Sequence, residues 1–207
     1  LTIKAFDEAL RRFGTRPLAE LIQPAIRWCE DGFPVRPHVH DFWMQPAMYG
    51  RIERVRVLRD HPASAKIYLK PDGSVRKVGE LLRNPDMGRT YRRIAEHGVD
   101  DFYHGEIAQR IAQDMKAHGG LITLEDLATC STESAAPLWT TYRGHRVATN
   151  PPPGGGLLIV MMLNILEHFD LAALGHNSPD YIAIVSEAMK IATLEKDTRM
   201  GDPRFVD

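Results

Sequence analysis

The densest candidate for chemistry is a run of three prolines and three glycines between a predicted strand and a predicted helix. A glycine-rich loop in this position can hold a phosphate, because successive backbone N–H groups can point at one anion. Proline has no N–H, and the run has neither the GxGxxG spacing nor the Gly-Lys-Ser/Thr ending of nucleotide-binding loops. We therefore predict a structural loop in which backbone packs closely against backbone. Its residues are Pro151, Pro152, Pro153, Gly154, Gly155 and Gly156.

Two histidines, His38 and His40, are the second candidate, since they would share one face of an extended segment and could bind a metal. A metal hydrolase needs further ligands at comparable spacing, and the other histidines are scattered among unrelated elements. We interpret this pair as loop histidines, with a metal hydrolase as a less favoured alternative. No cofactor or metal is predicted.

The remaining reactive side chains form no catalytic pattern. The charges of Glu195, Lys196, Asp197 and Arg199 are typical of a surface or interface ion-pair network. Cys29 and Cys130 lie too far apart to indicate a metal knuckle or a disulfide framework, and we expect two buried or half-buried thiols. No serine stands in a nucleophile-elbow sequence. The residues by themselves therefore identify no catalytic site.

The composition is that of a globular domain. Of 207 residues, 43% are hydrophobic and 26% charged, and the net charge is −1. Interspersed charges give no basic face for nucleic acid, and no apolar run is long enough to span a membrane. The sequence therefore predicts neither a nucleic-acid partner nor a membrane span.

Helical periodicity and capping signals predict most of the elements. Helices are expected at 2–13, 15–31 with Pro24 as a kink or a later start, 85–97, 100–103, 105–118, 124–129 and 179–197. We expect residues 34–50 to be mainly loop, 51–59 to be strand or helix, and 66–70 to be a short strand. In the first helix, the residues expected to face inward are Ile3, Phe6, Ala9, Leu10 and Phe13.

A β-hairpin over 142–149, closed at Arg143-Gly144, precedes the proline-glycine loop. Residues 157–166 are apolar almost all the way round, which predicts a helix buried on every side. A valine in place of Gly155 should then clash with its surroundings. We expect one helix-rich α/β (α+β) unit over residues 1–207.

The ends of the sequence suggest a piece of a longer protein. Leu1 is not an initiator methionine, no signal peptide is visible, and the chain stops soon after Gly201-Asp202-Pro203. We therefore expect that residues needed for chemistry lie outside it.

Four stretches, in order over nearly the whole chain, resemble the γ-glutamyltranspeptidase family, also called glutathione hydrolases. They are RRFGTRPLAELIQPAIRWCEDGFPV at 11–35, FYHGEIAQRIAQDMKAHGGLITLEDL at 102–127, PLWTTYRGHRVATNPPPGGGLLIVMMLNILEHFDL at 137–171 and SEAMKIATLEKDTRMGDPRFVD at 186–207. The resemblance is weakest at about 36–62.

The resemblance implies an N-terminal-nucleophile hydrolase, an αββα sandwich to which this chain contributes a helical layer and a β-hairpin. Members cut themselves before a threonine into a large and a small subunit, and this chain resembles the C-terminal part of the large one. The new N-terminal threonine attacks a γ-glutamyl amide such as glutathione, and the acyl group passes to water or an amino acid. A periplasmic or extracellular location is also typical.

By the same resemblance, no catalytic residue falls on this chain. The threonine belongs to the small subunit, the implied partner, and the family's carboxylate-binding arginine lies upstream of Leu1. The sequence departs from the family in Pro153-Gly154-Gly155-Gly156, which is one residue shorter than usual, and in Leu194-Glu195-Lys196. Two alternatives stay open: a related acylase, such as a cephalosporin acylase, and a non-catalytic interaction domain.

Overall fold

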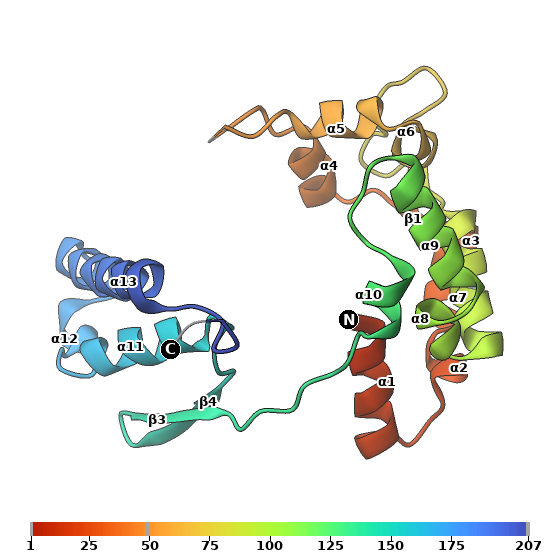
Figure 1. Cartoon of the computed structure of the whole chain (residues 1–207). Coiled ribbons are helices and arrows are strands. Elements are labelled where there is room, and N and C mark those ends of the chain that lie inside the picture. The colour runs from red at the N-terminus through yellow and green to blue at the C-terminus, as the bar shows by residue number, and fades with distance from the viewer. Residues whose placement is uncertain (1, 49, 206–207) are drawn as a thin grey trace. The chain divides into compact units, whose positions relative to one another are not determined.

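The structure is a computed structural model, and it describes residues 2–48 and 50–205 (Figure 1). Contacts within the chain group it into two compact units, Leu1–Thr132 and Glu133–Asp207, where the sequence suggested one. We describe each unit separately.

Unit 1 begins with three helices, α1 (Thr2–Phe13), α2 (Leu18–Leu21) and α3 (Gln23–Asp31). The expected helix over 15–31 is thus two helices, because Pro24 lies in the first turn of α3, where a missing N–H costs nothing. Gly32 ends α3 with φ 92°, a conformation that glycine adopts without strain.

Helix α1 is attached through its first turn. The backbone N–H of Lys4 donates to the hydroxyl of Tyr103 (3.1 Å), and its ammonium group donates to the carbonyl of Cys130 (2.6 Å). The expected inward face is only partly correct. Ile3 packs against the core, whereas Phe6 is 60% and Phe13 83% exposed, because none of the described residues of this unit covers that side of the helix.

The middle of unit 1 differs most from expectation. The two-residue strands β1 (Phe33–Pro34) and β2 (Leu81–Leu82) pair antiparallel, and the described residues between them form three short helices. They are α4 (Pro37–Trp43), α5 (Arg54–Asp60) and α6 (Pro62–Tyr68). The strand expected at 66–70 is wrong, since Pro62 starts a helix that runs through most of it, and only Leu69 forms a β-bridge, to Val75.

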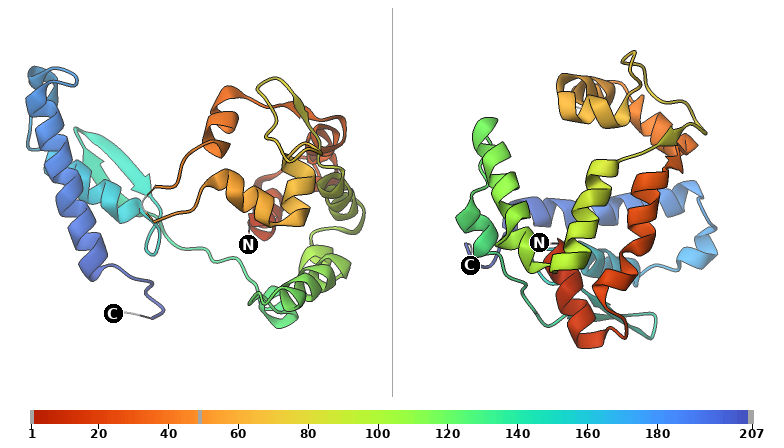
Figure 2. Two further views of the ribbon diagram at one scale, coloured as in Figure 1. Left: turned by 90° about the horizontal axis from the view of Figure 1, so that it is seen from above. Right: turned by 90° about the vertical axis from the view of Figure 1, so that its right-hand side faces the viewer.

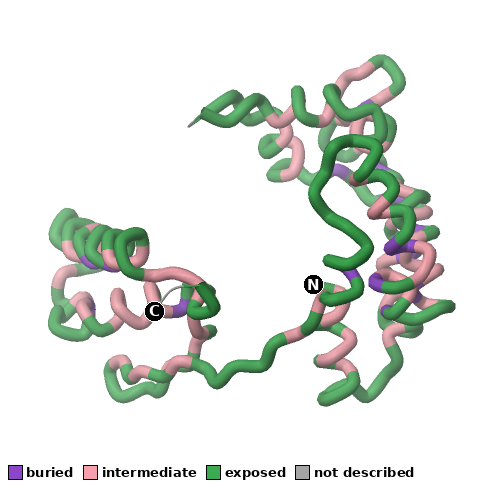
Figure 3. The backbone as a smooth tube through the Cα atoms, viewed as in Figure 1, coloured by how far each residue is buried: buried purple, intermediate pink, exposed green. Residues whose placement is uncertain are grey.

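The last four helices of unit 1 match the sequence signals closely. They are α7 (Pro85–His97), α8 (Asp100–Tyr103), α9 (Glu106–Ala117) and α10 (Leu124–Ala128). Asn84 caps α7 and Thr123 forms a reciprocal capping box with Asp126. The hydrophobic core cluster of this unit is formed by Ile94, Val99, Tyr103 and Ile107, over the segment from α7 to α9. Buried residues are purple in Figure 3.

The described residues of unit 2 form a hairpin and three helices. The strands β3 (Leu138–Tyr142) and β4 (His145–Thr149) pair antiparallel, with Tyr142 opposite His145. The hairpin therefore begins four residues earlier than expected, while its turn at Arg143-Gly144 is confirmed. The helices are α11 (Gly156–Leu166), α12 (Leu171–Leu174) and α13 (Pro179–Arg199).

Helix α11 packs against β3 and against α13, as Figure 2 shows. The expectation of burial on every side is wrong within this chain: only Gly156 and Leu166 are buried, and Ile159 is 51% exposed. A helix that is apolar on nearly every side can be buried on every side, but only if other parts of the protein pack against each of its faces. In the described part of the chain, no helix is both long and apolar enough to cross a membrane.

Candidate functional site

A groove lies between α7 and α9 in unit 1. Its volume is about 1000 Å³. Phe102, Ile107 and Ile111 contribute apolar lining, and arginines 89, 92, 93 and 110 contribute cationic lining. Apolar and charged side chains therefore share this groove.

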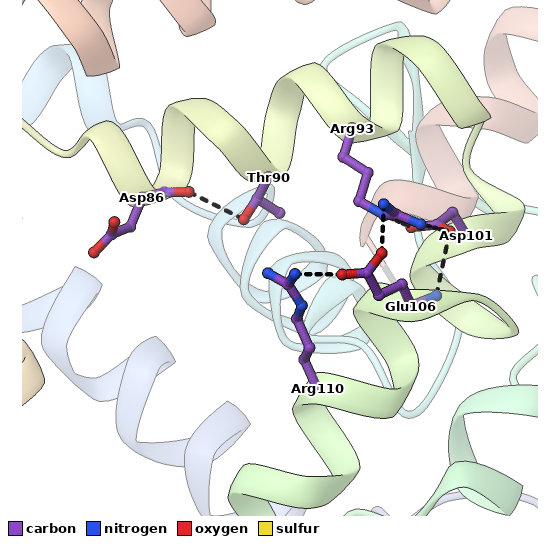
Figure 4. A network of polar contacts seen from close by, with 6 residues as sticks. All are labelled: Asp86, Thr90, Arg93, Asp101, Glu106 and Arg110. Atoms are coloured by element: carbon purple, nitrogen blue, oxygen red, sulfur yellow. Dashed lines mark hydrogen bonds and ion pairs between the residues drawn. The ribbon is translucent and has the colours of Figure 1, made fainter.

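Arg93 is the centre of a charged network at this groove (Figure 4). Its Nε and Nη2 donate to both carboxylate oxygens of Asp101, at 2.7 and 2.9 Å, and its Nη1 lies 2.6 Å from Glu106 Oε2. Glu106 also pairs with Arg110, one helical turn further along α9. The backbone N–H of Glu106 donates to Asp101 Oδ1 (3.2 Å), so the same carboxylate caps the start of α9.

The electrostatics show that this network stabilises structure. The guanidinium of Arg93 lowers the pKa of Asp101 to about 2, assisted by backbone N–H groups at the start of α9. The side chain of Asp101 is only 10% exposed. A carboxylate that is fully paired and ionised down to such a low pH is a poor general base near neutrality. Asp101 thus joins α7, α8 and α9.

The proline-glycine loop in unit 2 has two tight glycines and one open one. A Cβ on Gly156 would clash with the backbone oxygen of Asn150 and lie 2.8 Å from Thr149 Cγ2, while a Cβ on Gly154 would clash with the Asn150 side chain. A Cβ on Gly155 would meet no atom within 4 Å. The expected clash of a valine at position 155 is therefore wrong, because that position faces open space in this chain.

The hairpin is tied to the helix that follows this loop. Thr140 Oγ1 donates to Asn164 Oδ1 (2.9 Å), and the backbone N–H of Arg143 donates to Glu167 Oε1 (2.8 Å). The guanidinium of Arg143 donates to the carbonyl of Phe169 (2.9 Å). These contacts hold the hairpin against α11, so the loop between them connects two fixed elements.

The structure does not bring the histidine pair together. His38 and His40 lie in α4 and not in an extended segment, so residues two apart point to nearly opposite sides. Across residues 2–48 and 50–205, no group of three or more His, Cys, Asp or Glu side chains could hold a metal ion. The metal-hydrolase alternative loses the geometry on which it depended.

The other singled-out residues are on the surface or half-buried. Lys196 pairs with Asp197 (2.6 Å) and Arg199 with Glu195 (3.3 Å), all at the exposed end of α13. Cys29 and Cys130 are free thiols of intermediate burial, as expected, and burial raises the pKa of the Cys29 thiol. A thiol with a raised pKa is a weak nucleophile.

Sequence reasoning missed the Arg93–Asp101 pair. The signal was present in Asp101, which stands four residues before Gly105, the N-cap residue of α9, where a carboxylate can accept exposed helix N–H groups. The partner could not be identified in the same way, because Arg93 is one of several arginines on α7. Only the packing of α7 against α8 selects it.

Comparison with known proteins identifies the family to which these two units belong. The sequence model of the family Gamma-glutamyltranspeptidase matches residues 2–207. The chain is 40% identical, over 99% of its length, to the glutathione hydrolase proenzyme of Escherichia coli (strain K12), and covers 34% of that protein. It is 38% identical, over 99% of its length, to the Acylase ACY 1 proenzyme of Pseudomonas sp. (strain SE83), and covers 35% of it.

Solved structures of the same kinds of protein are also similar to this chain. The γ-glutamyltranspeptidase of Helicobacter pylori is 31% identical and superposes with a TM-score of 0.89, covering 100% of this chain and 57% of that one. The cephalosporin acylase of Bacillus halodurans is 32% identical with a TM-score of 0.82, covering 99% of this chain and 37% of that one.

The chain spans about a third of the length of the curated relatives it matches. Its helix-rich α+β fold, expected from the sequence, is confirmed as part of an N-terminal-nucleophile hydrolase architecture. On the family match and these identities, the chain belongs to the γ-glutamyltranspeptidase family.

Proposed function

We propose that this chain is a scaffold part of an enzyme that cleaves γ-glutamyl amides, of which glutathione is one, and transfers the acyl group to water or an amino acid. It corresponds to the C-terminal part of the large subunit, and the nucleophilic threonine belongs to the small subunit of the same precursor. The carrying observation is 40% identity along 99% of this chain to a glutathione hydrolase proenzyme.

The geometry supports a scaffold role. In the part of the chain that the structure describes, the best-organised polar cluster, around Arg93 and Asp101, pairs all its carboxylates with arginine. The loop at residues 151–156 places a hairpin against α11 and has no charged side chain. Both features position elements, which is what a reaction centre supplied by another subunit requires.

The first test is an intact-mass spectrum of the protein expressed from its complete gene. We expect two chains, the smaller beginning with threonine, because self-cleavage before the nucleophile frees the amine that serves as its base. A single uncleaved chain would contradict the proposal and favour a non-catalytic interaction domain.

The second candidate function is a related amide acylase, favoured by the similarity to Acylase ACY 1 and to a cephalosporin acylase. Parallel assays of the processed protein with a γ-glutamyl anilide and with an acylated cephalosporin separate the two. Faster turnover of the anilide supports the first function, and faster turnover of the cephalosporin supports the acylase.

A further inference from the structure

We draw no further inference here: the strongest candidate, the exposed apolar side of α13 in unit 2, where Ile182 and Met189 are each 51% exposed, carries nothing, because the chain spans about a third of the length of its relatives and nothing in the structure shows what covers that side.

Discussion

Gly155 and Gly156 are neighbours with different requirements, and a matched pair of alanine substitutions tests this. Gly156→Ala should cost about 1–3 kcal/mol of unfolding free energy, because its Cβ clashes with backbone that cannot rotate away. Gly155→Ala should change stability by less than about 0.5 kcal/mol, because its φ of −71° suits any residue and its Cβ meets nothing. Urea unfolding of both variants decides. Equal losses would mean that the loop does not pack as the structure shows.

Asp101 makes stability depend on pH in acid. Its pKa is lowered from 3.8 to about 2, so the folded state favours the ionised carboxylate. That contribution is fully present above pH 3.8 and is lost as the pH falls towards 2. Asp101→Asn should lose about 1–3 kcal/mol at neutral pH and show a smaller further loss across this window.

Urea midpoints measured from neutral pH down to pH 2 test the role of Asp101. The control is Asp114→Asn, on the same groove, whose side chain is 69% exposed and should matter little. If the Asp101→Asn and wild-type curves stay parallel throughout the acid range, the Arg93–Asp101 pair does not contribute as described.

At the scale of elements, the β3–β4 hairpin depends on its turn. Arg143 and Gly144 have φ of 49° and 79°, which matches the left-handed turns that join two-residue hairpins. Gly144→Ala should therefore cost about 1–2 kcal/mol through backbone strain alone, since its Cβ would meet no atom within 4 Å. Gly155→Ala is the control, because it adds the same methyl group at negative φ. Indistinguishable urea midpoints for the two variants would contradict this account.

Helix α11 shows what the elements of this chain leave uncovered. It packs on β3 and α13, yet Ile159 remains 51% exposed. An apolar helix is normally covered on every side. This chain spans about a third of the length of its relatives. Other parts of a protein of that length are available to pack against the exposed side of α11.

At the scale of the whole molecule, we predict that the 207 residues produced alone do not hydrolyse a γ-glutamyl anilide, whereas the processed product of the complete gene does. The physical reason is that the proposal assigns the nucleophilic threonine to the small subunit, so these residues lack the group that covalent catalysis needs. Release of the aniline chromophore measures both samples. Turnover by the 207-residue chain would place a catalytic group within it and contradict the scaffold proposal.

The sequence by itself determined the elements whose signals are local. Asn84-Pro85 and Gly98 fix both ends of α7, and Ser178-Pro179 fixes the start of α13, because caps and proline sterics act between adjacent residues. The turn at Arg143-Gly144 follows in the same way. Membership of the γ-glutamyltranspeptidase family also followed from the sequence, through ordered stretches that span nearly the whole chain.

Tertiary structure decided everything that depends on what lies opposite a residue. It selected Arg93 as the partner of Asp101 and separated the tight Gly156 from the open Gly155. It also left Phe6 and Phe13 exposed on a helix whose periodicity pointed them inward. Periodicity gives the face of a helix, and loop composition gives its flexibility. Neither identifies the residues that pack against the segment. Burial and steric clashes depend on two surfaces in contact, and the sequence of one segment describes only one of them.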